Sequence, residues 1–95
     1  MSKSIEGWRH FFAAVTALAT MPGSIVERVG HAYWEGLRKG ADAELPAELR
    51  NEYARMMSRL ETLYPTPHSR DVEPREAARM AKQILRLYDR MSRLT

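Results

Sequence analysis

The sequence predicts an all-α protein, a compact four-helix bundle with no β-strands. Apolar residues recur at steps of three and four, the spacing of one helix face, over residues of about 5–20, 25–39, 46–64 and 74–94. Proline or glycine separates these segments, at Pro22-Gly23, Gly40 and Pro65. No segment alternates apolar and polar residues as a strand would. We expect residues 1–95 to form a single helical domain.

The first expected helix is apolar on nearly every side, because the run from Phe11 to Met21 contains no charged residue. Its apolar face is expected to contain Ile5, Trp8, Phe12, Val15 and Ala19, with Phe11 and Leu18 beside it. A helix of this kind is usually buried, so we expect it to be the central element, with Ser4 as its N-cap. Three neighbouring helices would not cover it fully, and we therefore expect self-association, as a homodimer.

A capping box marks the start of the second helix, since Ser24 precedes Glu27 by three residues. Val29, Tyr33 and Leu37 form its apolar stripe, and Gly30 on the same side would allow a close helix approach. Gly40 is the expected stop.

The third helix is expected to begin at Pro46 and the fourth near Pro74, because proline is favoured at the first helical position. Asp71 or Glu73 would cap the fourth helix. The expected core face of the third helix contains Leu49, Tyr53, Met56, Leu60 and Leu63, and that of the fourth contains Ala77, Met80, Ala81, Ile84, Leu87, Tyr88, Met91 and Leu94. Residues 52–64 and 76–88 share the frame E-x-A-R-M-x-x-x-[L/I]-x-x-L-Y, which favours an antiparallel pair with equivalent faces.

Composition limits the classes of function. The chain has no cysteine, which excludes disulfides and thiolate metal sites and favours a cytoplasmic location. The first helix has some features of a signal peptide, but Glu6 and Trp8 are atypical there. Its apolar run is too short to cross a bilayer, so no membrane partner is expected. No catalytic or nucleotide-binding motif occurs, and we expect neither enzyme activity nor a cofactor.

A basic stripe is the clearest candidate site. The expected last helix carries six cations at steps of four, three, four, four and three, which places them in one sector opposite its apolar face. They are Arg75, Arg79, Lys82, Arg86, Arg90 and Arg93. Such a stripe could bind nucleic-acid phosphates or an acidic protein, or it could be a solvated helix back. No aromatic residue interleaves it, so the sequence shows no platform for stacking bases.

Other features of the second helix support weaker interpretations. Glu27, His31 and Glu35 share a face and could bind a metal, but no matching Glu-x-x-His pair exists elsewhere, so we interpret them as a surface row and expect no metal. A helix-turn-helix around Met21-Pro22-Gly23 would put two glutamates of its recognition helix against phosphates. Trp34, at the margin of the apolar stripe, is the expected anchor of a protein interface.

Two functions remain open from the sequence. The preferred one is a protein–protein interaction or adaptor module, with an unknown protein partner. The alternative is a nucleic-acid-associated protein that binds phosphates through the stripe from Arg75 to Arg93.

Overall fold

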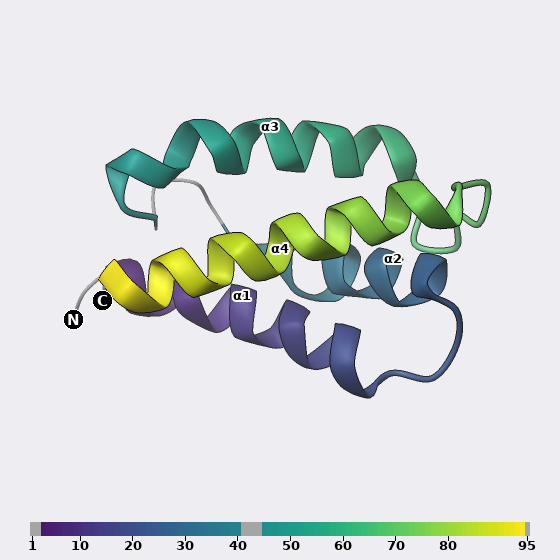
Figure 1. Ribbon diagram of the computed structural model, residues 1–95, viewed down its shortest axis with the longest axis horizontal. Helices are drawn as coiled ribbons and strands as arrows, with labels where there is room; N and C mark the ends of the chain where they lie inside the picture. The colour runs from purple at the N-terminus through teal and green to yellow at the C-terminus, as the bar shows by residue number, and fades with distance from the viewer. Residues whose placement is uncertain (1–2, 41–44, 95) are drawn as a thin grey trace.

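The computed structural model describes residues 3–40 and 45–94, and side chains from Gly7 onward. The described residues form α1 (Lys3–Thr20), α2 (Ile25–Glu35), the short 3-10 helix η1 (Leu37–Lys39), α3 (Ala47–Leu63) and α4 (Pro74–Leu94). They make an all-α four-helix bundle, as the sequence predicts, and no strand occurs in the described ranges (Figure 1). The expected second helix is divided, because it ends as an α-helix at Glu35 and continues beyond Gly36 as η1.

The turn between α1 and α2 follows from its sequence. The Ser24 amide donates to Glu27 Oε1 over 2.9 Å, and the Glu27 amide donates to Ser24 Oγ over 3.2 Å, which confirms the capping box. Gly23 has a φ of 106°, and a Cβ there would lie 2.7 Å from Glu27 Oε1. Glycine is therefore required at this position of the turn. Ser4, the expected N-cap of the first helix, lies inside α1.

The helices are arranged as two antiparallel pairs. In the first pair, Gly40 lies against His10 and Gly36 lies against Ala14, so later residues of the second segment meet earlier residues of α1. A helix-turn-helix instead sets its helices at about 90–120°. The structure therefore provides no such recognition unit at Met21–Gly23. In the second pair, α3 and α4 run in opposite directions, which confirms the expected pairing (Figure 1).

The central helix is α4 and not α1, contrary to the sequence-based expectation. It packs against α1, α2 and α3 and crosses the middle of the bundle in Figure 1. Its residues Ala77, Met80, Ile84, Leu87 and Met91 are buried on one side. The predicted core face of α4 is confirmed at these positions, but Leu94 is exposed because it lies at the open end of the helix.

The buried face of α1 is also rotated from the expected one. Phe11, Ala14, Ala17 and Leu18 are buried, whereas Phe12 and Ala19 are exposed. The helix is uncharged from Phe11 to Thr20, so no charged residue there marks the side that faces solvent. Gly36 explains the observed choice, because a Cβ there would lie 3.1 Å from the Ala14 backbone nitrogen and the two helices meet at this point.

Tyr64 fastens the end of α3 to α2. Its hydroxyl donates to the Val26 carbonyl over 2.8 Å, and its ring covers Gly30, where a Cβ would lie 2.9 Å from the ring. The expected close approach of a helix is therefore found at Gly36 and not at Gly30, where the close neighbour is the Tyr64 ring. Burial raises the pKa of the Tyr64 hydroxyl to about 12, so it remains a donor at neutral pH.

Candidate interaction surface

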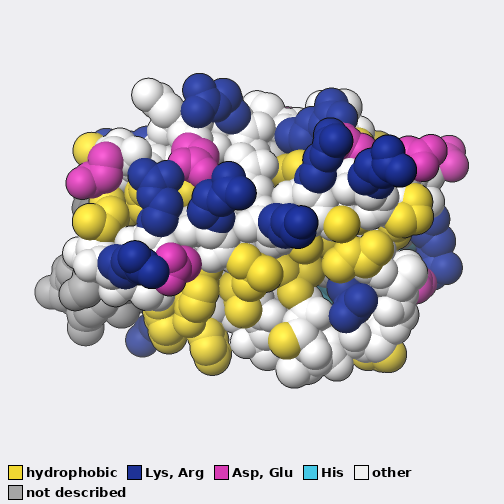
Figure 2. All heavy atoms as spheres, in the orientation of Figure 1, with side chains coloured by type: hydrophobic (Ala, Val, Ile, Leu, Met, Phe, Trp, Pro, Cys, Tyr) yellow, Lys and Arg dark blue, Asp and Glu magenta, His cyan; other side chains and the backbone are white. Residues whose placement is uncertain are grey.

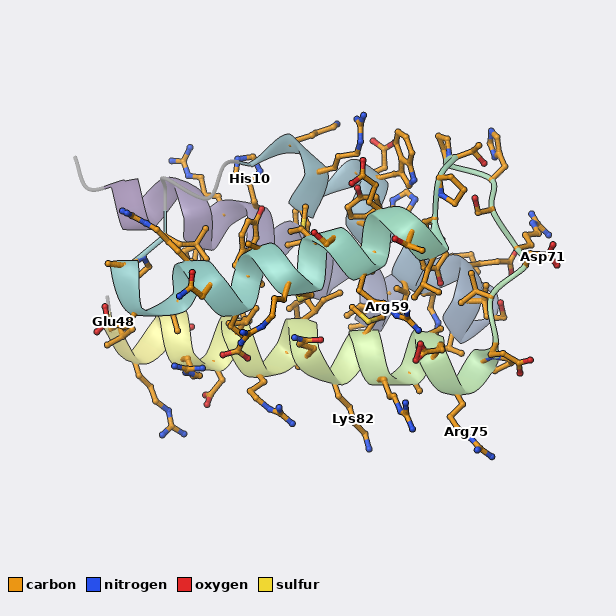
Figure 3. The ribbon with its side chains drawn as sticks, turned by 90° about the horizontal axis from the view of Figure 1, so that it is seen from above. His10, Glu48, Arg59, Asp71, Arg75 and Lys82 are labelled. Atoms are coloured by element: carbon orange, nitrogen blue, oxygen red, sulfur yellow. The ribbon has the colours of Figure 1, made fainter. Side chains whose placement is uncertain are left out.

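The six predicted cations lie along the outer side of α4. Since the apolar residues of this helix point inward, residues on the opposite side of each turn face outward. Figure 3 shows the labelled side chains of Arg75 and Lys82 extending away from the bundle. Five of the cations are exposed and Arg90 is half-buried. The structure thus places the whole predicted stripe on one surface.

Ion pairs divide the stripe into two groups. Arg90 bonds Glu52 of α3 and so joins two helices, while Arg93 pairs with Asp89 at 3.3 Å and Arg79 lies 3.7 Å from Glu76. The other group forms no ion pair with the side chains of residues 7–40 and 45–94, and it comprises Arg75, Lys82 and Arg86. These three cations are the part of the stripe available to a partner.

The carboxylate of Glu76 is already engaged in interactions within the bundle. Its carboxylate accepts a bond from Arg59 of α3 and also faces Arg79 of its own helix. The bond from Arg59 is the main cause that lowers the pKa of Glu76 from its ordinary value of 4.5, and the charges of Arg59 and Arg79 add to it. Glu52 has the equivalent place in α3, so the first glutamate of each repeated frame pairs with an arginine of the opposite helix.

An aromatic ridge borders the stripe on its α1 side. Trp8 stacks on Phe12, with 5.0 Å between ring centroids and 13° between planes, and it also contacts Tyr88 at 5.9 Å. The indole nitrogen of Trp8 donates to Ser92 Oγ over 3.2 Å. Phe12 remains 48% exposed and Leu85, one turn from Tyr88, is 46% exposed. We call Trp8, Phe12, Leu85 and Tyr88 the aromatic ridge.

The ridge and the stripe form one continuous surface. Leu85 is the member of the ridge next to the stripe, since it follows Lys82 by one turn and precedes Arg86 by one residue. Figure 2 shows Lys and Arg side chains in a row along α4, with hydrophobic side chains directly beside them on the side of α1. We call this surface the α1–α4 face. The sequence shows no stacking platform within the stripe because two of the three rings, Trp8 and Phe12, come from the other end of the chain.

The outer side of α1 extends this face without adding charge. No Asp, Glu, Lys or Arg occurs between Arg9 and Glu27. The exposed residues in that interval are Phe12, Ala13, Thr16, Ala19, Thr20, Pro22, Gly23 and Ser24. The Thr20 hydroxyl donates to the Thr16 carbonyl over 2.7 Å, which satisfies that donor within the helix. A partner could therefore cover this side of α1 without removing a charge from water.

Trp34, the expected interface anchor, lies in a different part of the molecule and is only partly exposed. Its indole nitrogen donates to the Tyr64 carbonyl over 3.0 Å, and the Arg38 guanidinium lies 4.2 Å from the ring centroid. These contacts connect α2 to the end of α3. They give Trp34 a structural task beside the interface role predicted for it.

In the predicted row of Glu27, His31 and Glu35, both glutamates form hydrogen bonds or ion pairs with other residues. Glu27 accepts the Ser24 amide and pairs with Arg70 at 3.2 Å, and the first of these interactions is the main cause that lowers the pKa of Glu27. Glu35 pairs with Lys39 at 3.3 Å. Within the described part of the chain, no three His, Asp or Glu side chains are placed as a metal site requires. His31 instead lines a surface hollow of about 280 Å³ under the loop that precedes α4.

Comparison of the chain with models of protein families, with curated proteins and with solved structures finds no match in any of the three. None of the helices in the described residues has the length and apolar character needed to cross a bilayer. The residues of the α1–α4 face are therefore the basis of the functional argument.

Proposed function

We propose that the protein is a protein–protein interaction or adaptor module and that its binding surface is the α1–α4 face. The observation that carries this proposal is an exposed aromatic stack, Trp8 on Phe12, beside cations that lack acidic partners in the described ranges. Aromatic residues and arginine are enriched at the centres of protein interfaces and supply most of their binding energy.

The size of the surface is also suitable. The molecule measures 37 × 24 × 19 Å, and the α1–α4 face lies on the side viewed along the shortest axis. A standard interface buries about 800 Å² on each partner, so a partner of that size would cover the α1–α4 face and most of the rest of this side. Trp34 remains a candidate for a second contact region, on α2.

The unpaired cations support a second candidate function, binding of nucleic-acid phosphates. Lys82 and Arg86 lie one turn apart, about 6 Å along the helix, and Arg75 follows the same line. Binding of this kind must weaken steeply as salt rises, because it depends on release of counterions. Replacement of Arg75, Lys82 and Arg86 by glutamine would remove it and leave the fold unchanged.

Site-specific photo-crosslinking tests the preferred function. We would replace Phe12 with p-benzoylphenylalanine, irradiate the cells that make the protein, and identify the adducts by mass spectrometry. The same photoreactive residue at Ser58, exposed on the outer side of α3, is the matched control. The proposal predicts a protein adduct at position 12 that is absent at position 58. Adducts with nucleic acid alone would favour the second function, and adducts with the same chain would indicate self-association.

A further inference from the structure

We infer that the α1–α4 face binds one amphipathic α-helix that carries acidic residues along one flank. This inference rests on the proposed function, because it names the class of protein segment that the face would accept. It follows from the shape of the face, from the position of its cations, and from the ion pairs that already engage the acids along the length of the stripe.

The shape favours an elongated helical partner. α1 and α4 pack side by side, and exposed apolar side chains rise on both sides of the line between them, Phe12 from α1 and Leu85 from α4. A third helix along this line would place its apolar side chains between the two and contact both helices at once. The described residues offer no strand edge to which an extended segment could add.

The cations define where the acidic residues of the partner must lie. Arg75, Lys82 and Arg86 follow one side of the face at separations of seven and four residues, over about 16 Å. The other side, along α1, has no charge between Arg9 and Glu27. A partner helix that runs parallel or antiparallel to α4 would match this pattern. It would need acidic residues separated by seven and four positions on one flank, and small or neutral residues on the other.

A second copy of the chain does not match the same pattern. The acids along the length of the stripe are Glu52, Glu76 and Asp89, and all three are already paired with arginines, whereas Glu73 lies beside Arg75 at the end of the stripe. A second α1–α4 face would bring a second row of cations, with Glu73 at its end as the one acid of the described ranges near it that has no ion pair, so most of the first row would meet like charge. Nucleic acid would use the cations but leave the exposed ring of Phe12 and the uncharged side of α1 without a function.

A titration with designed peptides tests the inference. The probe is a helical peptide of about 18 residues, long enough to form a stable helix on binding, with leucines on one face and glutamates seven and four residues apart on one flank. The control peptide has the same composition, with the glutamates moved to the side opposite the leucines. Calorimetry at about 0.15 M salt measures binding, and amide NMR of the labelled protein locates it.

The inference predicts one-to-one binding of the probe and at least about tenfold weaker binding of the control peptide. F12A and the triple variant R75Q/K82Q/R86Q should each weaken the probe about tenfold, since each removes one half of the recognition. R55Q, which changes an exposed cation of α3 that forms no ion pair in the described ranges, is the matched control and should have no effect. K82E/R86E should bind a probe with lysines in place of the glutamates.

Several results would overturn the inference. They are no binding of the probe, equal binding of both peptides, no effect of F12A, a protein that is already a dimer through Phe12, and displacement of the probe by DNA or by anionic vesicles. The crosslinking experiment at position 12 separates these failures from failure of the proposed function. A protein adduct there without probe binding would retain the function and reject the acidic helix as partner, whereas no protein adduct would reject both.

Discussion

The outer sides of α1 and α4 are both exposed to solvent, but that of α4 is mostly charged and that of α1 after Arg9 is uncharged. The exposed residues of α4 include four arginines, a lysine and an aspartate. The exposed part of α1 after Arg9 consists of Phe12, alanines and threonines. Both helices contribute buried residues to the same core, so their inner sides do not explain the difference.

This comparison separates two uses of a helix back. The charged back of α4 is well hydrated and confines its apolar residues to one narrow face. The outer side of α1 has no charged group, so its desolvation costs little free energy when a partner covers it. This property suits a binding surface. The α1–α4 face combines the two, with a region that is easily desolvated beside a region that attracts charge.

The largest expected effect tests which side of α1 is inside. Phe11 is 1% exposed and its neighbour Phe12 is 48% exposed. F11A should lower the free energy of unfolding by about 3–5 kcal/mol, because it leaves a cavity in the core. F12A should lower it by about 1 kcal/mol, the value of its stack on Trp8. Urea denaturation measures both, and equal losses would mean that α1 is rotated from the orientation described.

A second pair of neighbouring residues, on α4, allows the same comparison of a buried with an exposed side chain. Ile84 is fully buried and Leu85 is 46% exposed. I84A should cost about 2–5 kcal/mol of unfolding free energy, and L85A should cost less than about 1 kcal/mol. A large loss in L85A, measured by thermal or urea unfolding, would show that Leu85 belongs to the core and that the aromatic ridge is shorter than we describe.

A smaller effect distinguishes the two groups of cations in the stripe. R90Q removes the ion pair with Glu52 that joins α3 to α4, and it should lower the unfolding free energy by up to about 1 kcal/mol. K82Q removes a cation that forms no such pair in the described ranges, and its effect should lie within about 0.5 kcal/mol of zero. Equal effects in urea denaturation would contradict the division of the stripe.

The smallest effect is a dependence of stability on pH. The Arg59 bond lowers the pKa of Glu76 below 4.5, so the folded state binds fewer protons there than the unfolded state. Its contribution is fully present above pH 4.5 and is lost as the pH falls through the lowered pKa of the folded state. The urea midpoint of the wild type should therefore fall below pH 4.5, and E76Q should reduce that fall. E48Q, at an exposed glutamate without an ion pair in the described ranges, should reduce it less.

The sequence was sufficient for the starts of α2 and α4 because local interactions set them, but it did not predict the end of α2 at Glu35 or the start of α1 before Ser4. The capping box at Ser24 and the glycine at position 23 act within a few residues, and the structure confirms the start of α2. The narrow apolar face of α4 was equally clear, since polar residues mark both of its edges. Its last turn was less predictable, because Leu94 follows the same spacing but is 49% exposed.

The orientation of α1 could not be predicted in the same way. A helix with no charged residue from Phe11 to Thr20 has no strong polar marker there, so its buried side depends on where a neighbour approaches most closely. That point is Gly36, which is distant in sequence. For the same reason, the sequence predicted the basic stripe but not the aromatic ridge beside it. The two come together only in the fold, where Trp8 bonds Ser92 across 84 residues of sequence.

The two tryptophans report on separate events. Trp8 lies in the aromatic ridge, whereas Trp34 lies under Arg38 and bonds the end of α3. A ligand on the α1–α4 face should change the fluorescence emission of Trp8 and leave that of Trp34 constant, and detachment of α3 should do the reverse. With W8F and W34F as single-tryptophan variants, the protein carries its own optical means to separate binding from unfolding.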